Sequence, residues 1–297
     1  MTDAVIETQR LTKRYGEVEA IRGVSFQAKA ARITGFLGRN GAGKSTTIKV
    51  LLGMVRPTSG SGTILGHLVT NPLENLRLRK RVAYVGEDKG LYAYMTVGEM
   101  IRFTRSFYQD WREDMERSLL RDFELPLDRK VKALSKGMRT KLALLLALSR
   151  RPDLLILDEP TEGLDPVSIE ELLQRLAGRT AEGTAVFFSS HQLSEVERIA
   201  DDILVIDQGR LVLDITLDEM REKYRWVTLG FDCPASEEDF RMPGVERIRA
   251  KGRQVSVLTK GSAEALVERG RGLGAVSVDV TPVSLREVFL ETVQGPK

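Results

Sequence analysis

A glycine-rich segment followed by a lysine and two hydroxyl residues is the strongest chemical pattern in the chain. It reads Gly38-Arg39-Asn40-Gly41-Ala42-Gly43-Lys44-Ser45-Thr46. In loops of this spacing, backbone N–H groups surround a phosphate, the lysine reaches the terminal phosphates and the hydroxyl binds Mg²⁺. Glycine lets the backbone approach the phosphate and adopt positive φ. The segment predicts a nucleotide-phosphate site. An ordinary glycine-rich turn is the alternative, which the apolar run before it and the helical run after it disfavour.

Two adjacent acids, Asp158 and Glu159, follow the apolar run Leu154 to Leu157. Such a run is typical of a strand buried on both faces of a parallel sheet, and open α/β sheets bind ligands at the carboxyl ends of their strands. We expect Asp158 to hold Mg²⁺ through water and Glu159 to orient the water that attacks the terminal phosphate. A solvated turn would explain an isolated pair, but an enzyme with a phosphate loop needs an acid from a second strand.

A histidine, His191, comes directly after a third apolar strand that spans Val186 to Ser190. Its imidazole is placed to contact the terminal phosphate and to report its presence. The other histidine, His67, is predicted to be a surface turn residue.

Two residues have both a structural and a functional interpretation. Tyr15 ends the first stretch in which apolar and polar residues alternate. There it can stack on a purine base or pack at a strand edge. Ser135 is the predicted N-cap of a buried helix, whose free N–H groups and positive dipole end face whatever lies opposite. The local sequence leaves both interpretations open.

Composition excludes several classes of protein. The longest apolar run, residues 142–148, is far shorter than the ~20 residues that cross a bilayer, and the N-terminus lacks the pattern of a signal peptide. The lone Cys233 cannot form an internal disulfide, and two histidines give no structural zinc cluster. Charges of 45 basic and 42 acidic residues are too balanced to indicate nucleic-acid binding.

The hydrophobic pattern predicts the elements that position these residues. Residues 4–36 alternate apolar and polar side chains with breaks at Gly16 and Gly23, which favours short antiparallel strands before a strand at 33–37. Residues 82–85 read as a buried strand and 95–151 as helical, with a capping box at Thr96 and Glu99. A strand, turn and strand at 203–213 precede a helix at 216–224. Residues 225–297 alternate strands and helices as a small α+β unit.

The ordered set of motifs resembles the ATPases of ATP-binding-cassette (ABC) transporters over residues 4 to about 224. The resemblance rests on Gly38 to Thr46, Leu134 to Met138, Leu154 to Glu159, Glu162 to Asp165, and His191. It implies an α/β P-loop NTPase domain at 1–224, built as a RecA-like core with an antiparallel β subdomain and a helical subdomain at about 91–151. The small α+β domain then occupies 225–297.

The resemblance also implies partners and a location. Two such subunits, identical or different, would sandwich two ATP molecules with Mg²⁺ between them. Each ATP would lie between the phosphate loop of one subunit and the signature segment, Leu134 to Met138, of the other. Separately encoded integral membrane permease subunits would complete the transporter, with this chain peripheral on the cytoplasmic face of the cell membrane. No nucleic-acid partner is expected.

Single residues take their expected roles from the same resemblance. Tyr15 matches the base-stacking aromatic, Asp158 the metal-holding acid, Glu159 the catalytic base and His191 the switch histidine. Ser135 and Gly137 match signature residues that reach the opposite subunit's ATP. Asp165 matches a residue of the loop at the subunit interface, which is Glu162 to Asp165 here and is called the interface loop below. The phosphate and Mg²⁺ loop is matched by Asn40, Gly41, Gly43, Lys44, Ser45 and Thr46, with Gly38 and Ala42 counted as part of the same cradle.

Two departures from the family pattern bear on hydrolysis. Glu87 stands where the family usually has Gln, at a position that touches the metal and the attacking water. A carboxylate there binds Mg²⁺ more strongly but adds negative charge beside the terminal phosphate. We therefore expect hydrolysis to be slower or to be gated differently. In the signature segment, Lys136 replaces the first Gly and Met138 replaces Gln. Lys136 either adds a cation near the opposing phosphate or points to solvent.

The leading interpretation is the ATP-binding and ATP-hydrolysing subunit of a bacterial exporter. Its C-terminal extension, which ends Val283 to Leu290, looks like that of drug and antibiotic-peptide exporters. One alternative is a soluble ABC-type ATPase of translation or DNA repair, although those proteins carry tandem cassettes or a long coiled-coil insertion. Another is an ATP-gated clamp with weak hydrolysis, which the altered residues would favour.

Overall fold

The chain divides into two compact units, Met1–Asp214 and Ile215–Lys297. A computed structural model describes residues 4–261 and 263–294, and the side chains of residues 75–77 and 294 lie outside that description. The division comes earlier than the predicted boundary after residue 224. The helix predicted at 216–224 is present as Leu217–Lys223 (α8), capped by Thr216, but it counts with the second unit.

A six-stranded sheet in the order β10-β9-β3-β8-β7-β6 is the centre of the first unit. Its strands are Ile33–Leu37 (β3), Val82–Val85 (β6), Leu154–Asp158 (β7), Ala185–Ser190 (β8), Asp202–Asp207 (β9) and Arg210–Thr216 (β10). The pairs β3·β8, β3·β9, β7·β8 and β6·β7 are parallel. Every residue of β3, β7 and β8 is buried, as their continuous apolar runs predict. Since parallel strands end at one edge, the polar residues after β3, β7 and β8 come together there.

A second, four-stranded sheet has the order β2-β1-β4-β5. It consists of Ala4–Tyr15 (β1), Val18–Lys29 (β2), Ser59–Ile64 (β4) and His67–Leu68 (β5). Gly16 lies in the turn between β1 and β2, as predicted. The predicted break at Gly23 is wrong: this glycine has φ +65° inside β2, and the β1–β2 register shifts on both sides of the Leu11–Val24 pair, so the long ribbon continues through irregularities.

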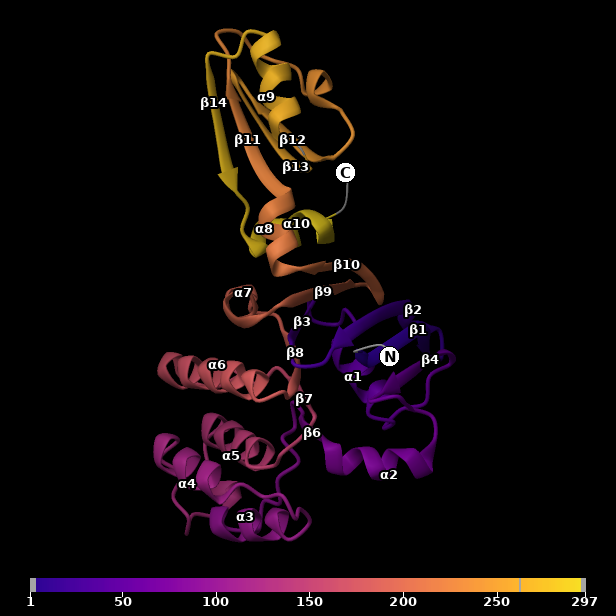
Figure 1. Cartoon of the computed structure of the whole chain (residues 1–297), viewed down its shortest axis with the longest axis vertical. Coiled ribbons are helices and arrows are strands. Elements are labelled where there is room, and N and C mark those ends of the chain that lie inside the picture. The colour runs from indigo at the N-terminus through magenta and orange to yellow at the C-terminus, as the bar shows by residue number, and fades with distance from the viewer. Residues whose placement is uncertain (1–3, 262, 295–297) are drawn as a thin grey trace. The chain divides into compact units, whose positions relative to one another are not determined.

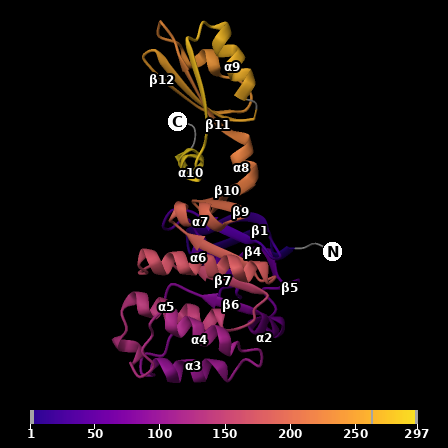
Figure 2. The same ribbon diagram turned by 60° about the vertical axis from the view of Figure 1, so that its left-hand side comes forward.

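Helices cover both faces of the six-stranded sheet. They are Lys44–Leu51 (α1), Pro72–Arg81 (α2), Val97–Arg105 (α3), Glu113–Asp122 (α4), Lys136–Leu148 (α5), Pro166–Ala181 (α6) and Leu193–Ile199 (α7), with a 3-10 turn at Val131–Ala133 (η1). Helix α1 contacts β7 as well as β2 and β4, so it packs between the two sheets, whereas α6 lies on the opposite face (Figure 1). The helices α3, α4 and α5 gather at one end of the unit, as both views show (Figure 2).

Two helices of the helical subdomain, α3 and α5, begin where capping signals predict. The Thr96 hydroxyl accepts from the Glu99 amide at 3.2 Å, and the Glu99 carboxylate accepts from the Thr96 amide at 2.8 Å. Ser135 caps α5 by accepting from the Met138 amide at 3.2 Å. Both caps satisfy backbone N–H groups that have no partner inside the helix.

The second unit is the small α+β domain that the sequence predicts. Its sheet has the order β12-β13-β11-β14. Its elements are Leu217–Lys223 (α8), Tyr224–Gly230 (β11), Glu237–Phe240 (η2), Val245–Lys251 (β12), Gln254–Lys260 (β13), Ala263–Gly272 (α9), Ser277–Pro282 (β14) and Leu285–Gln294 (α10). Val227, Leu229, Val257 and Leu266 of α9 share one core, and the Glu287 carboxylate of α10 accepts from the Trp226 indole at 2.9 Å.

Candidate functional site

A cavity of about 370 Å³ lies where β3, β7 and β8 end. It is lined by Ala20, Arg39, Asn40, Gly41, Gly43, Lys44, Ser45, Thr46, Glu87, Glu159, Glu162 and His191. The parallel sheet thus brings the phosphate loop, the acid after β7 and the histidine after β8 into one place. A larger hollow of about 650 Å³ lies at the opposite ends of β7 and β8, where it is lined by Asp153 and Thr184 but by none of the predicted site residues.

The glycines of the phosphate loop serve two purposes. Gly41 and Gly43 have φ of +80° and +110°, values that residues with a Cβ rarely adopt. A Cβ on Gly43 would also lie 2.6 Å from the Ala20 carbonyl oxygen, and one on Gly38 would lie 2.5 Å from that of Ile206. A Cβ on Gly41 would meet nothing within 4 Å. Gly38 and Gly43 therefore allow the loop to pack closely, whereas Gly41 leaves room beside the cavity.

Lys44, the first residue of α1, projects its ammonium into a polar corner of the cavity. Its side chain is only 6% exposed, and Nζ donates to the Gly38 carbonyl at 2.8 Å. Nζ also lies 3.3 Å from Glu159 Oε1. A buried ammonium is stable only when its charge is matched, and these partners match it. The N-terminus of α1 has no capping side chain, so its first N–H groups are available to bind an anion.

Glu159 connects the lysine to the histidine. Its second carboxylate oxygen, Oε2, lies 2.8 Å from Nδ1 of His191 and accepts from the His191 amide at 3.3 Å. The residue has φ +50°, a left-handed conformation that costs of order 1–3 kcal/mol in a residue with a Cβ. Its amide donates to the Ser189 carbonyl at 3.2 Å, which fixes the turn. Backbone strain of this kind clusters at functional sites.

Asp158, one residue earlier, is held from the neighbouring strand. It is 1% exposed, and its Oδ1 accepts from the Ser189 hydroxyl at 2.5 Å. The pairing of Asp158 with Ser189 in the β7–β8 ladder makes this hydrogen bond possible. Burial of the phenol raises the pKa of Tyr84 to about 12, with smaller contributions from the charges of Asp158, Asp88 and Glu87.

Most predicted loop residues line the cavity, and several other predicted residues do not. Gly38 and Ala42 of the phosphate loop and Asp158 at the end of β7 are buried and do not line the cavity. Tyr15 is 49% exposed, with the Lys13 ammonium 4.8 Å from its ring centroid. Ser135, Lys136, Gly137 and Asp165 also lie outside the lining.

The signature segment and the interface loop contact each other. A Cβ on Gly137 would lie 2.4 Å from the Gly163 carbonyl oxygen, so this position needs glycine for close approach. Asp165 caps α6 and accepts from the amide and hydroxyl of Ser168 at 3.0 and 2.5 Å, which lowers the pKa of Asp165 to about 2. The Lys136 ammonium lies 2.5 Å from Glu162 Oε1 and lowers the pKa of that carboxyl.

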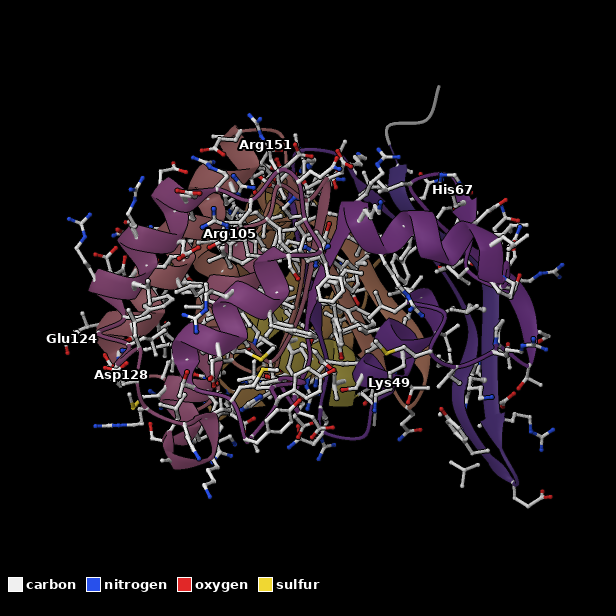
Figure 3. The ribbon with its side chains drawn as sticks, turned by 90° about the horizontal axis from the view of Figure 1, so that it is seen from below. Lys49, His67, Arg105, Glu124, Asp128 and Arg151 are labelled. Carbon is white, nitrogen blue, oxygen red and sulfur yellow. The ribbon has the colours of Figure 1, made fainter. Side chains whose placement is uncertain are left out.

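The sequence interpretation missed three residues that line the cavity. Arg39 and Glu162 stand inside recognised motifs, yet neither was assigned to the cavity, and Ala20 is supplied by the neighbouring antiparallel sheet. The available signal for Glu162 was a charged residue three positions after Glu159. His67 is in the short strand β5 rather than a turn, with Nδ1 3.6 Å from Glu74 Oε2, and it lies at the margin of the view in Figure 3.

Comparison with known proteins assigns the site to a family. The family model described as ABC transporter matches residues 21–162. The bacitracin transport ATP-binding protein BcrA of Bacillus licheniformis is 37% identical over 225 residues, which cover 74% of this chain and 72% of that protein. The chain belongs to the ABC transporter family of ATP-binding proteins.

Other relatives of this ABC protein extend the comparison. The Nod factor export ATP-binding protein I of Burkholderia orbicola is 36% identical over 72% of this chain and 71% of its own. The ABC transporter ATP-binding protein YtrB of Bacillus subtilis is 28% identical over 99% of each chain, so the likeness there includes the second unit. A solved ATP-binding subunit of an ABC transporter has a TM-score of 0.67 at 33% identity, covering 73% of this chain and 92% of that one.

The family settles the nucleotide and the fold. The P-loop NTPase fold is confirmed, as is the identity of the chain as an ABC transporter ATP-binding protein, and the translation or repair alternative finds no support among these relatives. A dimeric cassette, MJ0796, whose solved structure contains ADP and phosphate, shares the fold with a TM-score of 0.64 at 22% identity.

The residues of this ABC protein fit a magnesium ion that is bound together with nucleotide. The described residues contain no group of three or more His, Cys, Asp or Glu side chains that could hold a metal unaided. Mg²⁺ usually takes one or two protein oxygens, with waters and substrate phosphates completing its octahedron. The Ser45 hydroxyl and the Asp158 carboxylate are of the right chemistry, and Glu87 on the cavity wall offers a third oxygen donor.

Proposed function

We propose that this chain hydrolyses ATP to ADP and phosphate and thereby drives the membrane subunits of a bacterial exporter. The observation that carries the proposal is the position of Glu159 beside the phosphate loop. One of its carboxylate oxygens contacts Lys44 and the other contacts His191. The family and its relatives support ATP binding and a transporter; hydrolysis and export are the steps proposed.

The arrangement suits in-line attack of water on a terminal phosphate. Glu159 orients the water and accepts its proton, and His191 keeps the carboxylate in place. Lys44 leaves its present partners, Gly38 and Glu159, when a phosphate offers a stronger negative charge. Mg²⁺, held by Ser45 and Asp158, would neutralise charge on the phosphates.

A second subunit is part of the proposal. Ser135 and Gly137 lie outside the cavity of their own chain, so the donors of the α5 N-terminus are available to the ATP of another subunit. The Asp165 loop contacts the same segment. A dimeric structure of a cassette with the same fold supports this arrangement, and the partner is either a second copy or a related subunit.

An exposed aromatic patch supports docking of a membrane subunit. Tyr92, Tyr94, Phe103 and Phe107 are 46%, 68%, 38% and 61% exposed. The ring centroids of the pairs Tyr92–Tyr94, Tyr92–Phe103 and Phe103–Phe107 are 5.8, 5.5 and 5.1 Å apart. Large exposed apolar groups that touch each other mark interaction sites. The patch begins five residues after Glu87, so a partner bound there can move a wall of the nucleotide cavity. Figure 3 looks onto α3, which carries Phe103 and the labelled Arg105.

Export as the direction of transport follows from the relatives. One is named for bacitracin transport and another for Nod factor export. The described part of the chain contains no candidate membrane-spanning helix. By analogy with the ATP-binding subunits it resembles, the proposal places the chain peripherally on the cytoplasmic face.

Co-purification from detergent-solubilised membranes tests the proposal. Tagged wild-type chain is expected to carry a polytopic membrane protein, and the complex is expected to release phosphate from ATP faster than the isolated chain does. A Tyr94→Ser/Phe107→Ser variant should lose the membrane protein. Lys44→Ala should retain it while losing ATP turnover, because the lysine lies in the cavity and not in the patch.

Two outcomes would contradict the proposal. One is a wild-type chain that carries no membrane protein yet hydrolyses ATP at full rate, which would indicate a soluble ATPase. The other is a complex that binds ATP without releasing phosphate, which would favour the ATP-gated clamp that the carboxylate at Glu87 suggests.

A further inference from the structure

Glu195 carries a buried carboxyl group that the proposed mechanism leaves unused. The residue lies in the first turn of α7, is 5% exposed and does not line the nucleotide cavity. Glutamate is seldom buried to this extent unless other groups compensate for the water that it loses. Its place in the fold therefore needs an explanation.

Hydroxyl groups from two separate segments hold this carboxyl group. The Thr161 hydroxyl donates to Oε2 at 2.9 Å, and the Ser190 hydroxyl donates to the same oxygen at 3.4 Å. Both hydroxyl residues are buried. The other oxygen, Oε1, is shielded from solvent and has no hydrogen-bond partner among the described residues. A buried acceptor without a partner destabilises a fold, which favours a functional reason for a carboxyl group here.

The two hydroxyl residues flank the pair of residues assigned to hydrolysis. Thr161 follows Glu159 by two positions in the loop after β7, and Ser190 directly precedes His191 at the end of β8. Glu159 and His191 contact each other at 2.8 Å in the lining of the cavity. Glu195 therefore joins, outside that lining, the same two segments whose side chains meet inside it.

The backbone at Glu159 needs support on both sides. Its φ of +50° is a conformation that persists only where the surrounding structure holds it. Its amide donates to the Ser189 carbonyl at 3.2 Å, which holds the chain where it leaves β7. Two residues further on, the hydrogen bond from Thr161 to Glu195 holds the chain again.

We propose that Glu195 is a positioning residue that joins the loop after β7 to the end of β8 and thereby keeps the Glu159 carboxylate against His191. The inference rests on the proposed hydrolysis and deepens it. Glu195 acts through Thr161 and Ser190 and does not touch the nucleotide, since it lies outside the cavity lining.

Three variants and one control separate this role from a general loss of stability. Thr161→Val removes the hydroxyl that bonds to Glu195, and Glu195→Leu removes the acceptor. Glu195→Gln keeps an acceptor oxygen and loses the charge, which burial already disfavours by raising the pKa of the carboxyl. Thr184→Val is the matched control, because the Thr184 hydroxyl is also buried and donates to the Pro152 carbonyl at 3.1 Å, just before β8 begins.

Side-chain NMR of the ATP-free chain is the first readout, because it does not depend on hydrolysis. The chain contains two histidines, His67 and His191, so a His67→Ala variant assigns both imidazole signals. The Thr161 hydroxyl bonds to Glu195 and not to the imidazole. Thr161→Val should nevertheless shift the His191 signal and leave that of His67 unchanged. Thr184→Val should shift neither signal.

Steady-state ATP hydrolysis is the second readout. Thr161→Val and Glu195→Leu should each lower kcat by about 10-fold or more, because a small displacement of a catalytic group is costly. The KM for ATP should change less than ~2-fold, since the phosphate loop is intact. Glu195→Gln should keep at least about a third of the wild-type kcat, and Thr184→Val should keep all of it.

The double variant Thr161→Val/Glu195→Leu tests whether the two residues act together. Adding Thr161→Val to Glu195→Leu should lower kcat less than ~2-fold further, because the bond between them is already lost. Thermal melting checks that each variant is folded. If Glu195→Leu melts below the assay temperature, Glu195→Gln takes its place in the double variant, where Thr161→Val should again lower kcat by about 10-fold because the acceptor remains.

Two results overturn the inference. One is a Thr161→Val chain with wild-type kcat and an unshifted His191 signal, which means that the link does not position the pair. The other is a full multiplication of the losses in Thr161→Val/Glu195→Leu, which means that the residues act independently. A wild-type chain that does not hydrolyse ATP, with a His191 signal that still responds to Thr161→Val, would contradict the proposed function and not the link.

Discussion

The Nδ1 atom of His191 lies 2.8 Å from Oε2 of Glu159, and the His191 amide donates to the same oxygen. The histidine therefore fixes the carboxylate from two directions, although the two residues are 32 positions apart in the chain. Glu159 also pairs with Lys44 through its other oxygen. One side chain thus connects the phosphate loop, the strand β7 and the strand β8.

The first prediction concerns this contact. His191→Ala should reduce ATP turnover at saturating ATP by about 10²-fold, because a carboxylate displaced by an ångström no longer aligns the attacking water. Binding of ATP should change much less. Phosphate release and ATP titration measure the two effects. His67→Ala is the control, since His67 pairs with Glu74 outside the cavity; equal losses in the two variants would remove His191 from the mechanism.

A second prediction contrasts two glycines. Gly43→Ala should abolish ATP binding and lower the thermal midpoint, because its Cβ would lie 2.6 Å from the Ala20 carbonyl oxygen at φ +110°. Gly178→Ala should instead stabilise the chain by about 0.5–1 kcal/mol, since Gly178 is an exposed residue within α6 and its Cβ would meet nothing within 4 Å. Thermal melting compares the two. A Gly43→Ala chain that still binds ATP would show that the loop can relax.

A third prediction addresses the carboxylate at Glu87. Glu87→Gln should raise the Mg²⁺ concentration needed for half-maximal turnover and raise turnover at saturating Mg²⁺ several-fold. The amide binds the metal less strongly and removes negative charge beside the phosphate. A Mg²⁺ titration of phosphate release measures both quantities. Identical curves for the two proteins would mean that this departure from the family pattern has no mechanistic weight.

A fourth prediction follows from the pKa of Asp165, which hydrogen bonds from Ser168 lower to about 2. An aspartate in an unfolded chain has a pKa of about 3.9. The folded carboxylate therefore contributes stability above that value, and this contribution is lost as the pH falls through about 2. Asp165→Asn keeps a good helix cap but no charge. It should be less stable than wild type at pH 7.

Urea denaturation at a series of pH values checks the sign. The difference in the free energy of unfolding between Asp165→Asn and wild type should begin to shrink below about pH 5, as the unfolded wild-type carboxyl takes up its proton. A difference that grows on acidification would mean that the charge of Asp165 destabilises the fold.

Local signals predicted much of this structure. The caps at Thr96 and Ser135 depend on hydrogen bonds within three residues, which the sequence contains in full. The buried strands β3, β6, β7 and β8 follow from apolar runs that only a sheet covered on both faces accommodates. The phosphate loop is equally local, because its glycines, lysine and hydroxyl are consecutive.

Other features depend on contacts between residues that are far apart in the sequence. Strand order decides that β8 lies between β3 and β7, and only then does Glu159 meet His191 and Lys44. The close approach of Gly137 to the Gly163 carbonyl depends on how the start of α5 packs against the loop after β7, which no periodicity encodes. The break expected at Gly23 failed because a long ribbon accommodates a positive-φ glycine through register shifts, and a pattern of alternation does not distinguish that from a turn.

The most direct measurement of the central claim is phosphate release by purified wild-type chain and by Glu159→Gln, with ATP binding measured in parallel. The account predicts that Glu159→Gln lowers turnover by roughly 10²- to 10⁴-fold, as expected for loss of a general base. ATP binding should persist, because Lys44, Ser45 and the loop amides remain. Turnover by Glu159→Gln equal to that of the wild type would contradict the claim that this carboxylate drives hydrolysis.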